Sequence, residues 1–191
     1  MVITVHLSLS STTALAAAIV AAASVLAFSQ LPDLPVWAAF IGWASYDHSG
    51  ATPRAAVRSS TALTFGVVMA WVVAIVVAAN ALPLGPPVAT AVSAGIASFV
   101  IVLASRLRYF AVVPATFYGF ASTFAYLSVA PAASTMGALT MFGWNNVLVA
   151  VPISLLTGTG LGIMHGWLAK FLATAGPKAV PGHPARLGGK S

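Results

Sequence analysis

The feature that most constrains this chain is where its few basic residues lie. All eight Lys and Arg fall in three places: around Arg54 and Arg58, at Arg106 and Arg108, and from Lys170 onward. Long apolar stretches separate these places, and cytoplasmic loops of membrane proteins collect Lys and Arg whereas exported loops do not. Six membrane-spanning segments with both termini in the cytoplasm put every basic residue on one side. The sequence therefore predicts this arrangement.

The composition is that of an integral membrane protein. Apolar residues make up 60% of the chain and charged residues 5%, and the mean hydropathy is +0.99. Soluble domains do not reach these values. The net charge of +6 comes from few, scattered residues, and orientation and attraction to anionic headgroups account for them without nucleic acid. With no cysteine, neither a disulfide framework nor a thiolate metal site is possible.

The apolar stretches predict an all-α, polytopic protein, because about 20 residues at about 1.5 Å each cross roughly 30 Å of hydrocarbon. The expected segments are residues 7–28, 35–49, 59–82, 87–105, 109–130 and 147–172. The first segment is long for the apolar core of a signal peptide and has no Lys or Arg before it. We expect a six-span membrane domain over residues 1–172 and a disordered cytoplasmic tail over residues 173–191, which are rich in Gly and Pro.

The second segment is short for a span. Its fifteen residues reach about 22 Å as a helix. We expect Asp33, in the first exported connection, to cap this helix, with Pro35 in its first turn and Gly50 at its end. The polar end, with Asp47 and His48, is then recessed from the cytoplasmic surface.

A repeat relates the two halves of the chain. Residues 36–45 match residues 113–122 at an offset of 77, with Phe-Ile-Gly-Trp-Ala-Ser opposite Phe-Tyr-Gly-Phe-Ala-Ser. We align the third segments at an offset of 96, which pairs Gly66 with Gly162 and implies an insertion of 19 residues near residues 132–147. The alternative is chance similarity among Gly- and Ala-rich spans.

Because each unit has an odd number of spans, three, the second copy is upside down in the membrane relative to the first. The sequence thus predicts two inverted three-helix repeats, over about residues 7–82 and 87–172. Inverted repeats recur in transporters and channels, whose binding or permeation site lies near the repeat interface.

Small residues recur every fourth position in the third and sixth segments. The two ridges are Ala62, Gly66 and Ala70, and Gly158, Gly162 and Gly166. Lipid offers no hydrophobic drive for helix association, so close backbone approach must supply the packing. We interpret both ridges as packing devices that cross each other at the bundle centre or face a second copy of the chain in a homo-oligomer.

The aromatic and small residues of the second and fifth segments resemble a known family. They are residues 40–46 followed by Gly50, and the pattern aromatic-x-x-x-Pro-small-Thr-Phe-x-Gly from Phe110 to Gly119. This combination is similar to the bacterial inner-membrane family called domain of unknown function 1097. The resemblance implies a polytopic protein of the bacterial inner membrane. It implies no established activity, so no site residue is carried over.

Polar residues in the second and fifth segments are the candidates for lining a solute path, because polar groups in spans are costly. They are Gly42, Ser45, Asp47 and His48, and Thr116, Gly119, Ser122, Thr123 and Tyr126. In the fifth segment, intervals of three and four place four of these residues on one helical face. This stripe can line a narrow pore. Alternatively, its hydroxyls bond to their own helix or a neighbour, and Asp47 with His48 caps a helix or meets an arginine.

The sequence favours transport over catalysis. It has no phosphate loop, nucleophile elbow, paired carboxylates or Cys/His cluster, so we expect no enzyme, no cofactor and no metal site. The repeat, the short segment and the hydroxyl stripe favour a membrane channel or facilitator for a small neutral or weakly charged solute. The alternative is a non-transporting membrane scaffold or assembly protein. The insertion at residues 132–147 is apolar enough to be re-entrant or interfacial.

Overall fold

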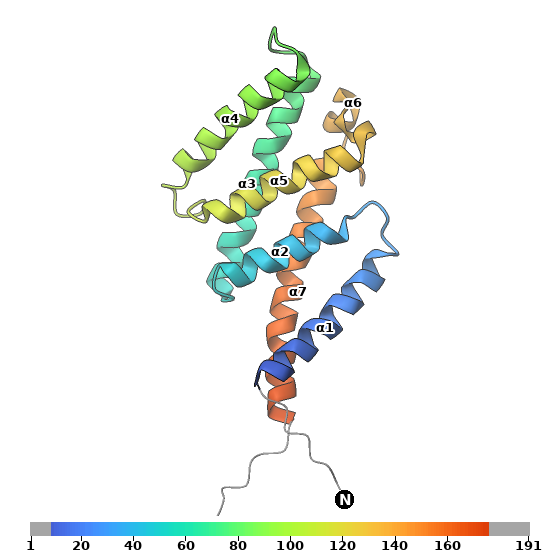
Figure 1. Cartoon of the computed structure of the whole chain (residues 1–191), viewed down its shortest axis with the longest axis vertical. Helices are drawn as coiled ribbons and strands as arrows, with labels where there is room; N and C mark the ends of the chain where they lie inside the picture. Colours follow the sequence, from blue (N-terminus) through green and yellow to red (C-terminus); the bar gives the residue numbers. More distant parts are fainter. Residues whose placement is uncertain (1–8, 176–191) are drawn as a thin grey trace, which may run out of the picture.

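The structure, a computed structural model, describes residues 9–175, with side chains from residue 10 to residue 174. This part of the chain is helical throughout and has no β-strand, which confirms the predicted all-α class (Figure 1). The helices are α1 (Leu9–Phe28), α2 (Val36–His48), α3 (Pro53–Ala78), α4 (Pro86–Ala104), α5 (Val113–Val129), the 3-10 helix η1 (Pro131–Ser134), α6 (Met136–Thr140) and α7 (Val147–Ala175).

Four helices are long and apolar enough to cross a membrane, namely α1, α3, α4 and α7. The other two large helices are shorter. The 13 residues of α2 reach about 20 Å and the 17 residues of α5 about 26 Å. The second segment is therefore short, as predicted, but the fifth is also shorter than predicted. It begins at Val113 because Pro114 occupies its first turn, where a missing N–H costs nothing.

The start of α3 lies six residues before the predicted one. The Thr52 hydroxyl accepts a hydrogen bond from the Ala55 backbone N–H at 3.1 Å, and Pro53 follows in the first helical position. A hydroxyl cap and a proline at this point start a helix without regard to hydropathy.

The expected cap of α2 is not formed. Pro35 occupies the N-cap position, and no side chain caps the helix, so the prediction for Asp33 is wrong. The end of the helix is as predicted, since Gly50 has a φ of +102°, a conformation that glycine adopts without strain. The last helix, α7, continues to Ala175, so the predicted tail begins later than residue 173. Residues 176–191 lie outside the described part.

The two longest helices, α3 and α7, run in opposite directions, and each is crossed by a short helix (Figure 1). Helix α5 packs along α3, and α2 packs along α7. Helix α4 lies against α3 and α1 against α7. In Figure 1 the loops after α2 and α4 lie on the left and the end of α7 lies at the bottom, whereas the loop after α1 and the end of α5 lie on the right and the loop after α3 lies at the top.

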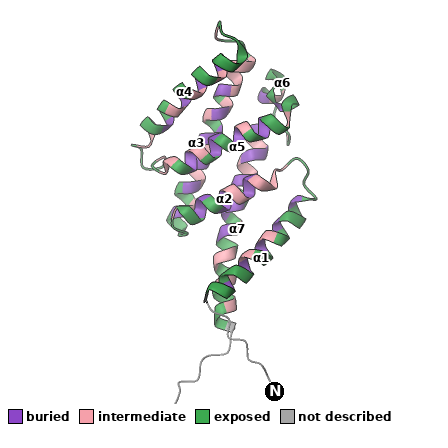
Figure 2. Cartoon of the chain, in the orientation of Figure 1, coloured by how far each residue is buried: buried purple, intermediate pink, exposed green. Residues whose placement is uncertain are grey.

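Burial follows this arrangement (Figure 2). One buried cluster joins α2, α3, α5 and α7 around Leu63, Val67 and Leu155. A second cluster joins α3, α4 and α5 around Ile101. The outer face of α4 is apolar and exposed, as for Phe99 at 69%. Such a surface suits lipid and not water.

The insertion after α5 is a small folded unit held by two side chains. The Asn146 amide donates to the carbonyls of Ala138 and Met141, at 2.9 and 2.8 Å, and the Trp71 indole donates to the Leu139 carbonyl at 2.9 Å. With five residues, α6 is too short to span a bilayer. The insertion therefore packs against α3 as a compact unit.

We predict that Asn146→Ala loosens this insertion. The substitution leaves the part-buried carbonyls of Ala138 and Met141 without this donor, at about 1–3 kcal/mol, so hydrogen exchange over residues 135–146 should accelerate. Asn145→Ala is the matched control, because Asn145 is bonded through its backbone carbonyl. Equal exchange in the two variants would contradict this role of Asn146.

Candidate functional site

The candidate glycines of α2 and α5 lie where each short helix crosses a long one. A Cβ atom at Gly42 would overlap with the backbone carbonyl of Leu155 on α7. A Cβ atom at Gly119 would overlap with the backbone carbonyl of Leu63 on α3. Both helix pairs therefore approach at backbone distance, which only glycine permits.

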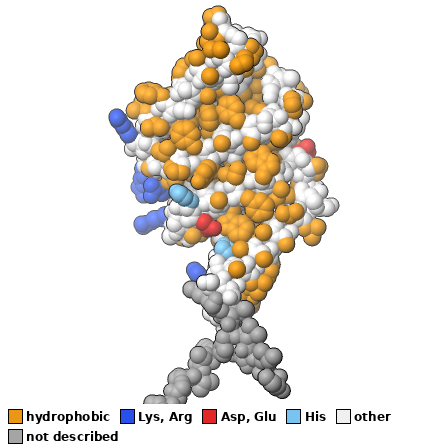
Figure 3. Space-filling view, viewed as in Figure 1, with side chains coloured by type: hydrophobic (Ala, Val, Ile, Leu, Met, Phe, Trp, Pro, Cys, Tyr) orange, Lys and Arg blue, Asp and Glu red, His pale blue; other side chains and the backbone are white. Residues whose placement is uncertain are grey.

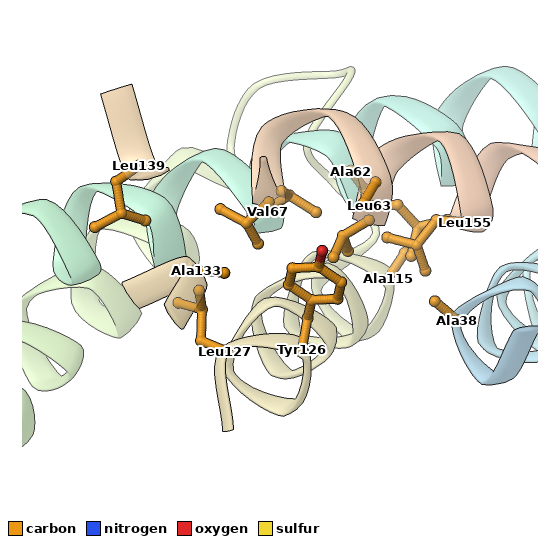
Figure 4. Close-up of a cluster of buried hydrophobic side chains, with 13 residues drawn as sticks. Ala38, Ala62, Leu63, Val67, Ala115, Tyr126, Leu127, Ala133, Leu139 and Leu155 are labelled. Atoms are coloured by element: carbon orange, nitrogen blue, oxygen red, sulfur yellow. The ribbon is translucent and has the colours of Figure 1, made fainter. Parts of the chain in front are cut away.

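The long helices contribute a glycine to each crossing in return. A Cβ atom at Gly158 would overlap with the carbonyl of Ala39 on α2, and one at Gly66 with the carbonyl of Thr116 on α5. The next contacts also match, since they involve the backbone nitrogens of Trp43 and Phe120 respectively. Figure 4 shows Leu63, Ala115 and Leu155 close together in this region, with Ala38 beside them.

The two crossings are equivalent at constant offsets. The residues of α2 correspond to those of α5 at 77, as in Gly42 and Gly119. The residues of α3 correspond to those of α7 at 92, as in Gly66 and Gly158. The alignment at 96 is therefore wrong by one helical turn. Gly162, which it paired with Gly66, meets the side chains of Trp43 and Tyr46 instead.

The two small-residue ridges do not cross each other. Gly66 faces α5 and Gly158 faces α2, whereas Gly166 has no neighbour within 4 Å. Gly66, Gly158 and Gly162 thus pack against neighbouring helices and Gly166 does not, and the alternative of a crossing at the bundle centre is wrong. Each ridge accommodates a short helix, because backbone contact with one helix leaves no room for another. Ala62 and Ala70 are fully buried beside Gly66.

Three candidate hydroxyls of α5, those of Thr116, Thr123 and Tyr126, lie on one buried face, as the spacing predicts. Thr123 donates to the Gly119 carbonyl at 3.1 Å and Thr116 to the Val112 carbonyl at 3.5 Å, both within the helix. Tyr126 donates to the Asn145 carbonyl at 3.2 Å. These hydroxyls are thus bonded inside the protein in this state.

The remaining candidates do not form one site with the α5 stripe. Gly42 and Ser45 are buried, whereas Asp47 and His48 are exposed at the end of α2. The side chains of Asp47 and His48 therefore lie at the protein surface and are not enclosed by other helices. Their recess from the cytoplasmic membrane surface stays a prediction.

A buried serine pair distinguishes the two halves. The Ser45 and Ser59 hydroxyls are 2.7 Å apart and join α2 to α3. Ser122 corresponds to Ser45 at the offset of 77, but Val151 stands where the offset of 92 places the counterpart of Ser59. The buried Ser122 hydroxyl has no hydrogen-bond partner in the described structure.

A cavity of about 460 Å³ lies where the α1–α2 loop meets the end of α5 and the start of α7. Its polar and aromatic lining residues are Asp33, Trp37, Tyr126 and Asn145. Of the predicted site residues, only Tyr126 lines it. Sequence reasoning used Asp33 only as a cap and missed Asn145, because 112 residues separate the two. The one available signal was an acid between prolines ahead of a short helix.

The comparisons with known proteins agree with the resemblance found in the sequence. The family model described as Protein of unknown function (DUF1097) matches residues 14–170. The chain belongs to this family. The match includes both glycine crossings and the cavity. No curated protein and no solved structure matches the chain, so the roles of residues in this DUF1097 protein rest on its own geometry.

We predict that Gly66→Ala and Gly158→Ala each destabilise the protein by about 1–3 kcal/mol or more, because the new methyl group meets backbone that cannot move aside. Gly95→Ala and Gly160→Ala are the controls, since neither glycine has a neighbour within 4 Å. Thermal unfolding of the four variants in detergent checks this. Similar midpoints for all four would show that the crossings are not close-packed.

The two equivalent serines should respond differently to alanine. Ser45→Ala leaves the Ser59 hydroxyl buried and unpaired, which costs about 1–3 kcal/mol. Ser122→Ala removes an unpaired hydroxyl and should be neutral or stabilising. Denaturation in mixed micelles measures both, and an equal loss in the two variants would contradict the asymmetry.

Proposed function

We propose that this protein is a membrane facilitator for a small neutral or weakly charged solute, built from two inverted three-helix repeats. The first repeat is α1, α2 and α3, and the second is α4, α5 and α7. The equivalent crossings of α2 on α7 and of α5 on α3 support this division. In both units the first helix lies against the long helix of the other unit: α1 lies against α7, and α4 lies against α3.

In this proposal α2 and α5 are short spans. Alternate loops lie on opposite sides of the bundle in Figure 1, as six spans require. The Lys and Arg side chains seen in Figure 3 lie along the left and lower left, beside the loops after α2 and α4. By the excess of basic residues in cytoplasmic loops, this side and both termini are cytoplasmic. The family resemblance supports the bacterial inner membrane.

The observation that carries the proposal is a difference between the two sides of the bundle. The cavity beside Asp33 is open on the non-cytoplasmic side. At the position equivalent to Asp33 stands Phe110, whose ring stacks on Phe65 at 4.4 Å between centroids. These two rings line a cavity of about 450 Å³ that has no charged lining residue. The Thr61 hydroxyl also donates a hydrogen bond to the Tyr109 backbone carbonyl at 3.0 Å. The two cavities thus differ in chemistry, since only the one beside Asp33 has a charged lining residue.

Passage through the bundle then needs movement of one repeat against the other. The contacts of Gly42 with Leu155 and of Gly119 with Leu63 close the centre in this state. An exchange between this state and one open to the cytoplasm gives slow, saturable flux and not a continuous pore. The buried hydroxyls of Thr116 and Thr123 lie along the α5 face between the two sides.

We predict that proteoliposomes swell above empty vesicles with at least one of urea, glycerol, short amides or ammonium. Ala132→Trp should remove most of this flux, because Ala132 is exposed and lines the cavity. Ala81→Trp is the control, since Ala81 is exposed in the next loop on the same side. Flux that is unchanged in Ala132→Trp would show that the solute does not enter through this cavity.

A non-transporting scaffold is the second candidate. The sealed centre favours it, because glycine against backbone carbonyl leaves no path in this state. It predicts no flux for any solute and a protein that co-purifies with the wild-type chain. The same vesicle experiment therefore separates the two functions.

A further inference from the structure

We infer that the cavity between the α1–α2 loop, α5 and α7 binds a small organic ammonium cation. The inference rests on the proposed function, in which this cavity admits the solute. The lining residues are Asp33, Trp37, Tyr126 and Asn145 with Pro, Ala and Val side chains, and they include no Lys, Arg or His. Asp33 thus supplies the one formal charge of the lining, and that charge is negative.

The surroundings leave this charge uncompensated. In Figure 3 the basic side chains lie on the left and lower left, and one acidic group lies at the right edge, the side of the α1–α2 loop in Figure 1. No Lys, Arg or His lines the cavity beside Asp33, so no cation within the lining neutralises the carboxylate, and a cation gains from entering it.

The lining fits an organic cation better than a metal ion. Metal ions such as Ca²⁺ take six or more oxygen ligands, and the cavity offers one carboxylate. Within residues 9–175, no group of three or more His, Asp or Glu side chains could hold a metal ion. An ammonium group, in contrast, is attracted by a carboxylate together with aromatic rings, and Trp37 and Tyr126 are among the lining residues.

Hydrogen bonding and size agree with this class of ligand. The Tyr126 hydroxyl donates to the Asn145 backbone carbonyl, so its oxygen can still accept a hydrogen bond from an ammonium N–H. The Asn145 side chain adds a second acceptor. The Pro, Ala and Val side chains cover alkyl groups. A cavity of about 460 Å³ lies in the lower range of small-molecule sites, which suits an amine with a few carbon atoms.

The repeat-related position shows what the acid adds. Phe110 replaces Asp33 there, and Ser49 replaces Tyr126 at the offset of 77. The positions equivalent to Asp33 and Tyr126, on the side of the arginines, therefore carry neither a carboxylate nor a phenol. A cation is captured on one side of the bundle and is not retained on the other.

The test is isothermal titration of the purified full chain in detergent with tetramethylammonium chloride, methylammonium chloride and the neutral isostere tert-butanol. We expect saturable binding of at least one cation and none of tert-butanol. Asp33→Asn should weaken cation binding at least about tenfold. Asp47→Asn makes the same charge change at an exposed acid outside the cavity and should bind as the wild type does.

Binding without cations, equal affinity for tert-butanol, or equal affinity of Asp33→Asn and wild type would each overturn the inference. Asp33 is exposed and caps no helix, so its variant should elute from a sizing column as the wild type does. Flux of glycerol or urea into vesicles with no cation binding would refute the ammonium site and leave the facilitator. Asp33-dependent binding with no flux would support the ammonium site and refute the facilitator.

Discussion

The structure depends on two places where helix backbones touch. At each one a glycine of a short helix meets a carbonyl of a long helix, and a glycine of the long helix meets a carbonyl in return. In lipid, where apolar side chains gain nothing by leaving the solvent, this contact is the main source of attraction between helices. It fixes how α2 lies on α7 and how α5 lies on α3, and thereby where all the loops lie.

Equivalent packing with unequal side chains gives the molecule its two different sides. The crossings repeat at offsets of 77 and 92, yet Asp33 corresponds to Phe110 and Ser59 to Val151. One side has a cavity with a carboxylate, and the other has two stacked phenylalanines. We expect function to reside in these departures from symmetry, since the shared contacts serve packing.

Sequence reasoning found the features that are local. The short second helix, its end at Gly50 and the similarity of α2 to α5 follow from residues next to one another. The alignment of α3 with α7 did not follow, because Gly158, Gly162 and Gly166 repeat every turn and a shift of four residues preserves the pattern. Only the contacts that each of these three glycines makes with another helix distinguish them. The cavity was equally hidden, since three separate segments form it.

The chain has no cysteine, so single cysteines can report which side each loop faces. The most direct test of the six-span inverted repeat is labelling of Ser29→Cys, Ala51→Cys, Leu107→Cys and Ala132→Cys with an impermeant maleimide in intact cells. The account predicts labelling at residues 29 and 132, and at residues 51 and 107 only after permeabilisation. Labelling of residue 51 from the same side as residue 29 would show that α2 does not cross the membrane, and the inverted repeat would be wrong.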